Sequence, residues 1–203
     1  MFVKKFKILS KKLIVDEPYC QIEKQQVLTH NGTKLDWFVQ LNYDAVIVVP
    51  FFKTGEVLLQ KAYKHGAQSF IIEFPAGLTE NKKELLKHAA ARELREETGV
   101  VAKKITKIGS VLANPTGSPM RYHFFIAEGC QSLAEKELDD AEQTETFLIK
   151  NFKTAENYLL STMQPKDLAL KGPQVKFQTS TSTIAALPFV RKYLEKNKIS
   201  RDF

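Results

Sequence analysis

Three carboxylates crowd into one short segment, where Glu93, Glu96 and Glu97 are spaced as neighbours on one side of a helix. Apolar residues recur through the same segment with helical periodicity, so the acids are expected on an amphipathic helix. At about 100° per residue, Glu93 and Glu97 fall within about 20° of Leu86, on the apolar stripe. Carboxylates on a partly buried face repel one another and lose hydration unless a cation lies among them. The spacing therefore favours a bound cation.

Oxygen ligands of this kind suit a hard divalent ion such as Mg²⁺, with Mn²⁺ as a substitute. Mg²⁺ keeps several waters and substrate phosphates among its ligands. The alternative is a solvated helix surface held by pairs four residues apart, such as Arg92 with Glu96. The helical angles argue against that alternative, because they place the acids on the apolar side.

Strands and helices alternate irregularly around this segment. The predicted helix spans 82–98 and is closed by Gly99, and Pro75 and Gly77 end the strand before it. An Asn31-Gly32 turn signal joins two short strands near the N-terminus. Strands are predicted at 19–28, 34–41, 44–52, 53–63, 69–77, 100–113, 121–129 and 145–150, and further helices at 154–163 and 180–196. This mixture favours an α+β layered fold.

Composition indicates a folded protein, and the length fits one domain of ordinary size or one domain with a small appendage. The 203 residues are 43% hydrophobic and 26% charged, which is the range of globular proteins. Cys20 and Cys130 are far apart and form no CxxC motif, so neither a disulfide framework nor a thiolate metal site is expected. Lysines interrupt the apolar N-terminal residues, and no run approaches the ~18 apolar residues of a membrane span. A cytoplasmic protein without a membrane partner is expected.

The net charge of +7 raises the question of nucleic-acid binding, because basic surfaces attract polyanions. The lysines are scattered, however, and no recognition signature with interleaved aromatic residues is present. A solvated lysine surface is the favoured interpretation, and nucleic acid is not an expected partner. A salt-dependent binding assay would distinguish the two.

The helix and its preceding turn resemble the Nudix box, which reads Gly, five residues, Glu, seven residues, then Arg-Glu-aliphatic-any-Glu-Glu-any-Gly-aliphatic. Six residues rather than five separate the first two motif positions here. The residues that carry the resemblance are Gly77, Glu84, Arg92-Glu93-Leu94, Glu96-Glu97 and Gly99-Val100.

The resemblance extends to the ADP-ribose pyrophosphatases and related nucleoside diphosphate sugar hydrolases. "LLQKAYKHGAQSFIIEFPAGL" is similar to the segment before their box, and Pro115 lies 15 residues past Val100, where that subfamily has its proline. The resemblance implies a Nudix α/β/α sandwich with an N-terminal antiparallel β arm. Residues 1–43 would be the arm, used for homodimerisation and base binding, and residues 44–203 the catalytic domain.

The resemblance also implies roles for residues of the box. Glu93 and Glu97 would be the principal metal ligands, and Glu96 would share or bridge the metal. The carbonyl of Ala76 resembles the backbone ligand. Arg92 would orient the glutamates through charge-assisted hydrogen bonds.

Four residues outside the box resemble substrate-binding positions, and each has a structural alternative. Trp37 would stack on the nucleobase, or would be a core or interface tryptophan. Lys64 would meet the phosphates, or would be a surface lysine at a strand end. Pro115 and Ser118 belong to a loop that resembles the one near the terminal sugar, or that forms only a tight turn.

Hydrolysis of a pyrophosphate requires a group that orients or deprotonates water. By resemblance Glu142 is the candidate, with Glu145 as the reserve. The expected reaction is Mg²⁺-dependent cleavage of ADP-ribose, or a similar nucleoside diphosphate sugar, to a nucleoside monophosphate and a sugar phosphate. The alternatives are hydrolysis of GDP-mannose, a dinucleoside polyphosphate or capped RNA, and a non-catalytic binding module.

Overall fold

The computed structural model of this chain describes residues 3–18, 20–133, 135–138, 143–163 and 177–199. These residues divide into two compact units. One unit joins the chain up to Asp44 with Val111–Arg121, and the other comprises Ala45–Ser110 and the chain from Tyr122 onward. Among the described residues, no helix has the length and apolar character needed to cross a membrane.

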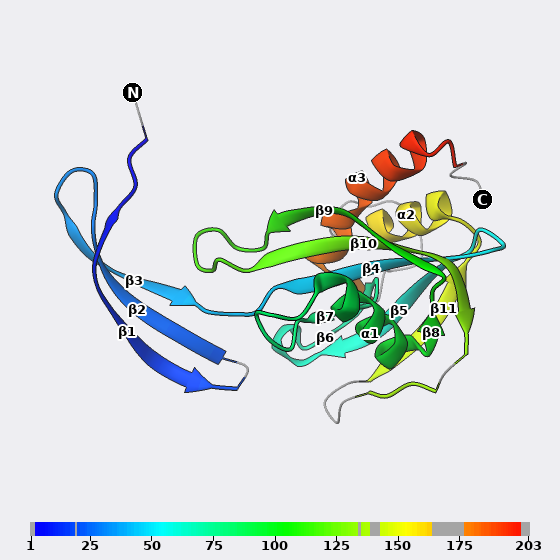
Figure 1. The fold of residues 1–203 in the computed structure, drawn as a ribbon, viewed down its shortest axis with the longest axis horizontal. Coiled ribbons are helices and arrows are strands. Elements are labelled where there is room, and N and C mark those ends of the chain that lie inside the picture. Colours follow the sequence, from blue (N-terminus) through cyan, green and yellow to red (C-terminus); the bar gives the residue numbers. More distant parts are fainter. Residues whose placement is uncertain (1–2, 19, 134, 139–142, 164–176, 200–203) are drawn as a thin grey trace, which may run out of the picture. The chain divides into compact units, whose positions relative to one another are not determined.

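The first unit contains an antiparallel sheet in the order β1-β2-β3 (Figure 1). Its strands are β1 (Lys7–Glu17), β2 (Cys20–Leu28) and β3 (Lys34–Gln40). β2 and β3 confirm the two N-terminal strands predicted from alternation, and Gly32 lies between them with a φ of 85°. β1 was not predicted. Two register shifts in its pairing with β2 interrupt the alternation of apolar residues that identifies a strand.

The second unit is built on a mixed sheet, which has nine strands within the described residues. β4 (Ala45–Phe52) runs through its middle, antiparallel to β7 and parallel to β10. β4 is buried along most of its length, as a central strand covered on both faces should be. The other strands are β5 (Val57–Lys64), β6 (Ser69–Glu73), β7 (Ala76–Leu78), β8 (Val100–Val101), β9 (Lys104–Leu112), β10 (Arg121–Ser132), β11 (Thr144–Ile149) and β12 (Gln178–Thr179).

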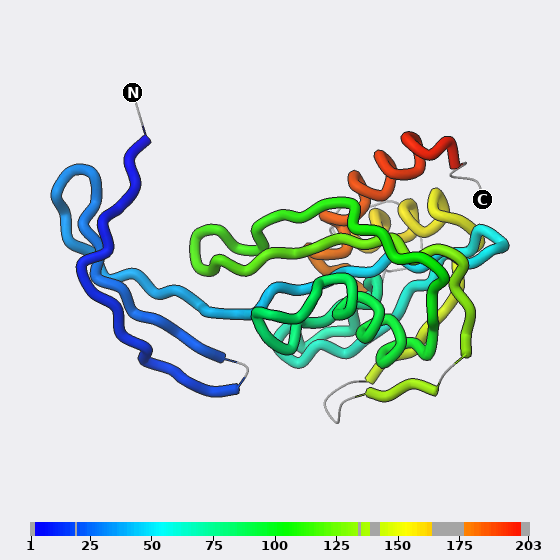
Figure 2. The backbone as a smooth tube through the Cα atoms, viewed as in Figure 1, coloured from blue at the N-terminus to red at the C-terminus, as the bar shows by residue number. Residues whose placement is uncertain are grey.

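Helices cover both faces of this sheet. α1 (Leu86–Thr98) lies on one face, and α2 (Phe152–Ser161) and α3 (Thr181–Lys196) lie on the other, as Figures 1 and 2 show. Successive residues of β10 face different helices: Phe125 packs in the same core cluster as Leu94 of α1, whereas Phe124 stacks on Phe189 of α3 with ring centroids 5.0 Å apart. This three-layer arrangement confirms the predicted α/β/α sandwich.

α1 begins and ends where local sequence signals allow. Its first residue is Leu86, four residues after the predicted start, because the chain from Asn81 still forms turns, with the Glu84 amide donating to the Asn81 carbonyl at 3.3 Å. The predicted end is confirmed. Gly99 adopts a left-handed φ of 67°, and its amide donates to the Arg95 carbonyl.

Candidate active site

The acids of α1 lie on its buried side. Glu93 is 8% exposed and Glu97 is 2% exposed, on the same helix face as the fully buried Ala90 and Leu94. Glu96 is half-buried at the edge of that face. The helical angles therefore placed the acids correctly relative to the core.

Glu97 is held in one orientation by two donors from different strands. Its Oε2 accepts a hydrogen bond from Gln60 Nε2 of β5 at 3.1 Å and another from the Ala76 amide of β7 at 2.9 Å. Hydrogen bonds to an ionised group are among the stronger ones in proteins. They fix the direction in which this carboxylate points.

Arg92 donates hydrogen bonds to three other glutamates of the site. Its Nη1 donates to Glu93 Oε1 at 2.8 Å and to Glu96 Oε2 at 3.0 Å. Its Nε donates to Glu84 Oε1 at 3.2 Å, and its Nη2 donates to the Leu78 carbonyl at 2.9 Å. Arg92 therefore makes the contacts with glutamates on which its predicted role depends.

Electrostatics keeps the Arg92–Glu84 pair charged. Burial alone would lower the pKa of Arg92, but its bonds to Glu84, Glu93 and Glu96 outweigh burial and raise it. Burial likewise acts to raise the pKa of Glu84, and the bonds from Arg92 and the Glu80 amide outweigh it, so this pKa is lowered. Glu84 thus still contacts Arg92, although six residues rather than five separate it from Gly77.

Gly77 gives the Glu93 carboxylate its space. A Cβ atom at this position would overlap the Glu93 carboxyl group. The neighbouring residue, Ala76, pairs with Ile47 in the β4–β7 ladder, so the backbone here is fixed and cannot move aside cheaply. A side chain at position 77 would therefore displace the Glu93 carboxylate.

We expect Gly77→Ala to displace the Glu93 carboxylate and lower kcat roughly 10²-fold, the cost typical of a group misplaced by about 1 Å. The measurement is steady-state hydrolysis beside a thermal melt. Gly109→Ala is the matched control, because a Cβ there overlaps the Phe189 ring outside the site. It should lower Tm without lowering the kcat of the folded protein. Equal kcat values in Gly77→Ala and the wild type would contradict the steric account.

A cavity of about 280 Å³ opens beside Glu97. Lys64 lies on its wall, and its Nζ is 2.9 Å from Oε1 of the buried Glu73. The cavity is therefore lined by an acidic residue and a basic residue. Among the described residues, its lining comprises Ala62, Tyr63, Lys64, His65, Gly66, Glu97, Gln143 and Thr144.

The start of β11 also reaches this cavity. Thr144 lines it and donates from its hydroxyl to the Glu97 carbonyl at 3.3 Å. Glu145, the next residue, is not part of the lining. Its side chain is 77% exposed and lies 3.7 Å from Lys61 Nζ. The other candidate for water activation, Glu142, lies outside the described residues, so its role stays a prediction.

Trp37, Pro115 and Ser118 come together in the first unit. Trp37 Nε1 donates to the Thr116 carbonyl at 3.0 Å, and Ser118 Oγ donates to the Gln40 carbonyl at 2.8 Å. These bonds attach the loop that contains Pro115 to β3. Three of the four predicted substrate-binding residues thus share one unit, whereas Lys64 lies with the carboxylates in the other.

The predicted metal ligands have the right chemistry for a hard ion. Three carboxylates and the Ala76 carbonyl supply oxygen donors, and the missing side chain of Gly77 leaves space at Glu93. In the described part of the chain, no three acidic, histidine or cysteine side chains are arranged as a ready metal cage. Arg92 instead contacts Glu93 and Glu96 in this conformation.

Sequence reasoning did not identify Gln60 as a residue of the site. A polar side chain within the apolar run "VLLQKAY" was the available signal. Its significance depends on the fold, because its contact with Glu97 joins residues 37 positions apart.

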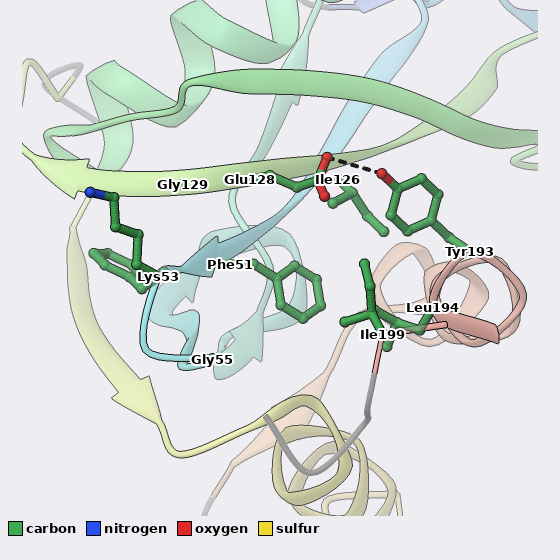
Figure 3. Close-up of a pocket in the computed structure, with 10 residues that line it drawn as sticks. Phe51, Lys53, Gly55, Ile126, Glu128, Gly129, Tyr193, Leu194 and Ile199 are labelled. Atoms are coloured by element: carbon green, nitrogen blue, oxygen red, sulfur yellow. Dashed lines mark hydrogen bonds between the residues drawn. The ribbon is translucent and has the colours of Figure 1, made fainter. Parts of the chain in front are cut away.

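A further cavity, of about 260 Å³, contains none of the predicted site residues. Phe51, Leu194 and Ile199 point into it, and Tyr193 donates to Glu128 on its wall at 2.9 Å (Figure 3). Its lining is mainly apolar, and the one acid among its described residues, Glu128, is paired with Tyr193 and is remote from the carboxylates of α1.

Comparison with known proteins gives consistent matches. A family model described as NUDIX domain matches residues 41–168. The ADP-ribose pyrophosphatase of Bacillus subtilis (strain 168) is 34% identical over 132 residues, covering 64% of each protein. An uncharacterized Nudix hydrolase of Schizosaccharomyces pombe is 32% identical over 154 residues, covering 72% of this chain and 70% of the relative. The chain therefore spans less than two thirds of the length of the Bacillus protein.

One solved structure, described as an ADP compounds hydrolase, has the same fold. It superposes with a TM-score of 0.74 at 18% identity and covers 98% of this chain and 100% of its own. Because identity is low, this similarity establishes the fold alone.

Proposed function

Since this chain belongs to the NUDIX domain family, we propose that it is a divalent-metal-dependent hydrolase of ADP-ribose or a related nucleoside diphosphate sugar. The observation that carries the proposal is the shared cavity, which Glu97 of the acidic helix and Lys64 both line. A carboxylate cluster binds the metal that a pyrophosphate requires, and a lysine supplies charge to its phosphates. The name of the Bacillus relative, ADP-ribose pyrophosphatase, supports this choice of substrate.

In this proposal Glu93, Glu96, Glu97 and the Ala76 carbonyl hold Mg²⁺, or Mn²⁺ in its place. The bound ion supplies neutralisation of charge that develops on phosphate oxygens. Arg92 keeps the acids together in the protein without metal, because it contacts Glu93 and Glu96.

The reaction requires little covalent chemistry from the chain. A water oxygen bonds to one phosphorus, the bond from that phosphorus to the bridging oxygen breaks, and the second phosphate leaves with the bridging oxygen. Glu142 accepts the proton of the attacking water. Lys64, kept in place by Glu73, attracts the pyrophosphate to the cavity as a point charge. The products are a nucleoside monophosphate and a sugar phosphate.

A substrate panel tests the proposal. The full-length protein with Mg²⁺ would be offered ADP-ribose, GDP-mannose, a dinucleoside polyphosphate and capped RNA, and the products would be identified by mass spectrometry. We expect the highest kcat/KM for ADP-ribose or another nucleoside diphosphate sugar. Selective hydrolysis of capped RNA or the dinucleoside polyphosphate would overturn the substrate assignment, and no turnover of any compound would support a binding module.

We further propose a homodimer formed through the sheet of β1–β3. A three-stranded sheet needs an apolar surface to cover it. Among the described residues of this sheet, only Val27 is buried, although several large apolar side chains are present. The exposed ones are Ile8, Leu9, Leu13, Ile14, Leu35 and Phe38.

Light scattering at micromolar concentration should therefore give twice the chain mass of 23.1 kDa. Leu13 and Leu35 lie on one face of this sheet, since Leu13 pairs with Glu23 and Leu35 pairs with Val27, four residues away on β2. Replacing both leucines by aspartate should shift the protein towards monomer, because charge then occupies this apolar surface. A wild-type monomer with full activity would count against this dimer.

A cytoplasmic location is proposed as well. Cys20 and Cys130 are both free thiols, and burial raises the pKa of Cys130 to about 12, so this thiol stays protonated and unreactive. Fractionation of the source cells would test the location, and recovery outside the cytoplasm would contradict it.

A further inference from the structure

Gln60 is a polar residue at a position that would suit an apolar one. It lies in the middle of β5, is fully buried, and has the apolar Leu58 and Ala62 two residues to either side on the same face of the strand. Glutamine is mostly exposed in proteins, so its burial here requires a reason.

The amide of Gln60 has one partner and one unsatisfied atom. Nε2 donates to Glu97 Oε2, the same oxygen that accepts a hydrogen bond from the Ala76 amide. The amide oxygen, Oε1, is buried and has no hydrogen-bond partner among the residues that the structure describes. A buried acceptor without a donor destabilises a fold. Stability therefore does not account for glutamine at this position.

A neutral donor is the group that Glu97 needs here. The Ala76 amide binds the same carboxylate oxygen from another strand, so the two donors together determine the direction of the side chain. Glu73 lies directly opposite Gln60 in the β5–β6 ladder and is already paired with Lys64. A second acid at position 60 would repel both carboxylates, and a lysine there would cancel the charge on Glu97.

We propose that Gln60 is a positioning residue, which holds the Glu97 carboxylate in its metal-binding orientation without neutralising it. This inference rests on the proposed function, because it assigns Glu97 to a divalent metal. Partners that orient ligating carboxylates influence metal affinity strongly, and their loss typically weakens binding by about 10–100-fold.

The test compares Gln60→Met with the wild type by titration with Mn²⁺ in a calorimeter and by thermal melts of metal-free protein. Methionine matches glutamine in size but cannot donate to Glu97. We expect the metal Kd to rise by about 10–100-fold. The metal-free Tm should change little, because loss of one hydrogen bond is offset by removal of a buried acceptor.

Leu59→Met is the matched control. Leu59 is fully buried on the opposite face of the same strand, and this substitution conserves volume. It should leave the metal Kd unchanged and alter Tm as much as Gln60→Met does. Gln60→Asn, whose shorter amide cannot reach Glu97, serves if Gln60→Met does not fold, and it should show the same loss of affinity.

Each outcome has a distinct meaning. A wild-type metal Kd in Gln60→Met, or in Gln60→Asn, would overturn the positioning role while leaving the proposed function intact. A fall in Tm at unchanged metal affinity would assign Gln60 to the fold alone. A wild-type protein that binds neither Mn²⁺ nor Mg²⁺ would overturn the proposed function and this inference together.

Discussion

Turnover of a nucleoside diphosphate sugar is expected to fall by about three orders of magnitude in Glu97→Gln. Enzymes lose activity on this scale when they lose one fixed group that stabilises the charge developing in the transition state. The glutamine can use its amide oxygen to accept the bonds that Gln60 and Ala76 donate to Oε2 of Glu97. Its NH₂ group then takes the place of the second carboxylate oxygen. A neutral donor replaces a charged acceptor in the metal-binding position, so metal affinity should fall with kcat while the fold is retained.

Glu156→Gln is the matched control for this substitution. Glu156 is also buried, on α2, where it pairs with Arg191 rather than with residues of the site. Its replacement should lower Tm, because it weakens an ion pair whose carboxylate is buried, and should leave kcat and metal affinity unchanged. Full activity in Glu97→Gln, or in wild-type protein with excess chelator, would refute the assignment of the metal to α1.

The second large effect is expected at Glu142. If this residue accepts the proton of the attacking water, Glu142→Gln lowers kcat by ~10²–10⁴-fold and changes KM little, because the lost interaction belongs to the transition state. Glu145→Gln should be much milder. The Glu145 side chain is highly exposed, and surface ion pairs such as the one with Lys61 contribute little.

Single-turnover kinetics on both variants, with saturating substrate and Mg²⁺, separates chemistry from product release. Metal titration of each variant serves as the control, since neither residue is assigned to the metal. A large loss in Glu145→Gln with none in Glu142→Gln would move the catalytic role three residues along the chain. If both variants react at the wild-type rate within error, neither acid takes part in catalysis and both are only solvated charges.

The periodicity of α1 was sufficient to predict the most informative part of the site. A helix places residues at regular angles, so the burial of Glu93 and Glu97 followed from their spacing relative to Leu86 and the rest of the apolar stripe. The end of the helix followed from Gly99, whose left-handed conformation has a local cause. Features set by neighbouring residues were therefore predictable.

Features set by distant residues were not. The contact of Gln60 with Glu97 and that of Arg92 with the Leu78 carbonyl depend on how the strands pack against the helix. Local sequence patterns do not predict this packing. The association of Val111–Arg121 with the N-terminal unit is likewise a long-range contact. β1 was missed for a different reason, because its bulges disrupt the alternation that marks a strand.

The most direct test of the account is hydrolysis of ADP-ribose in water enriched in oxygen-18, followed by mass spectrometry of the products. With Mg²⁺ present, we expect AMP and ribose 5-phosphate in equal amounts, with one labelled oxygen incorporated per molecule of substrate cleaved. Chelator should abolish this product formation, and Glu97→Gln should slow it by about three orders of magnitude. Unchanged ADP-ribose in the presence of Mg²⁺ or Mn²⁺, or products formed by Glu97→Gln at the wild-type rate, would contradict the account.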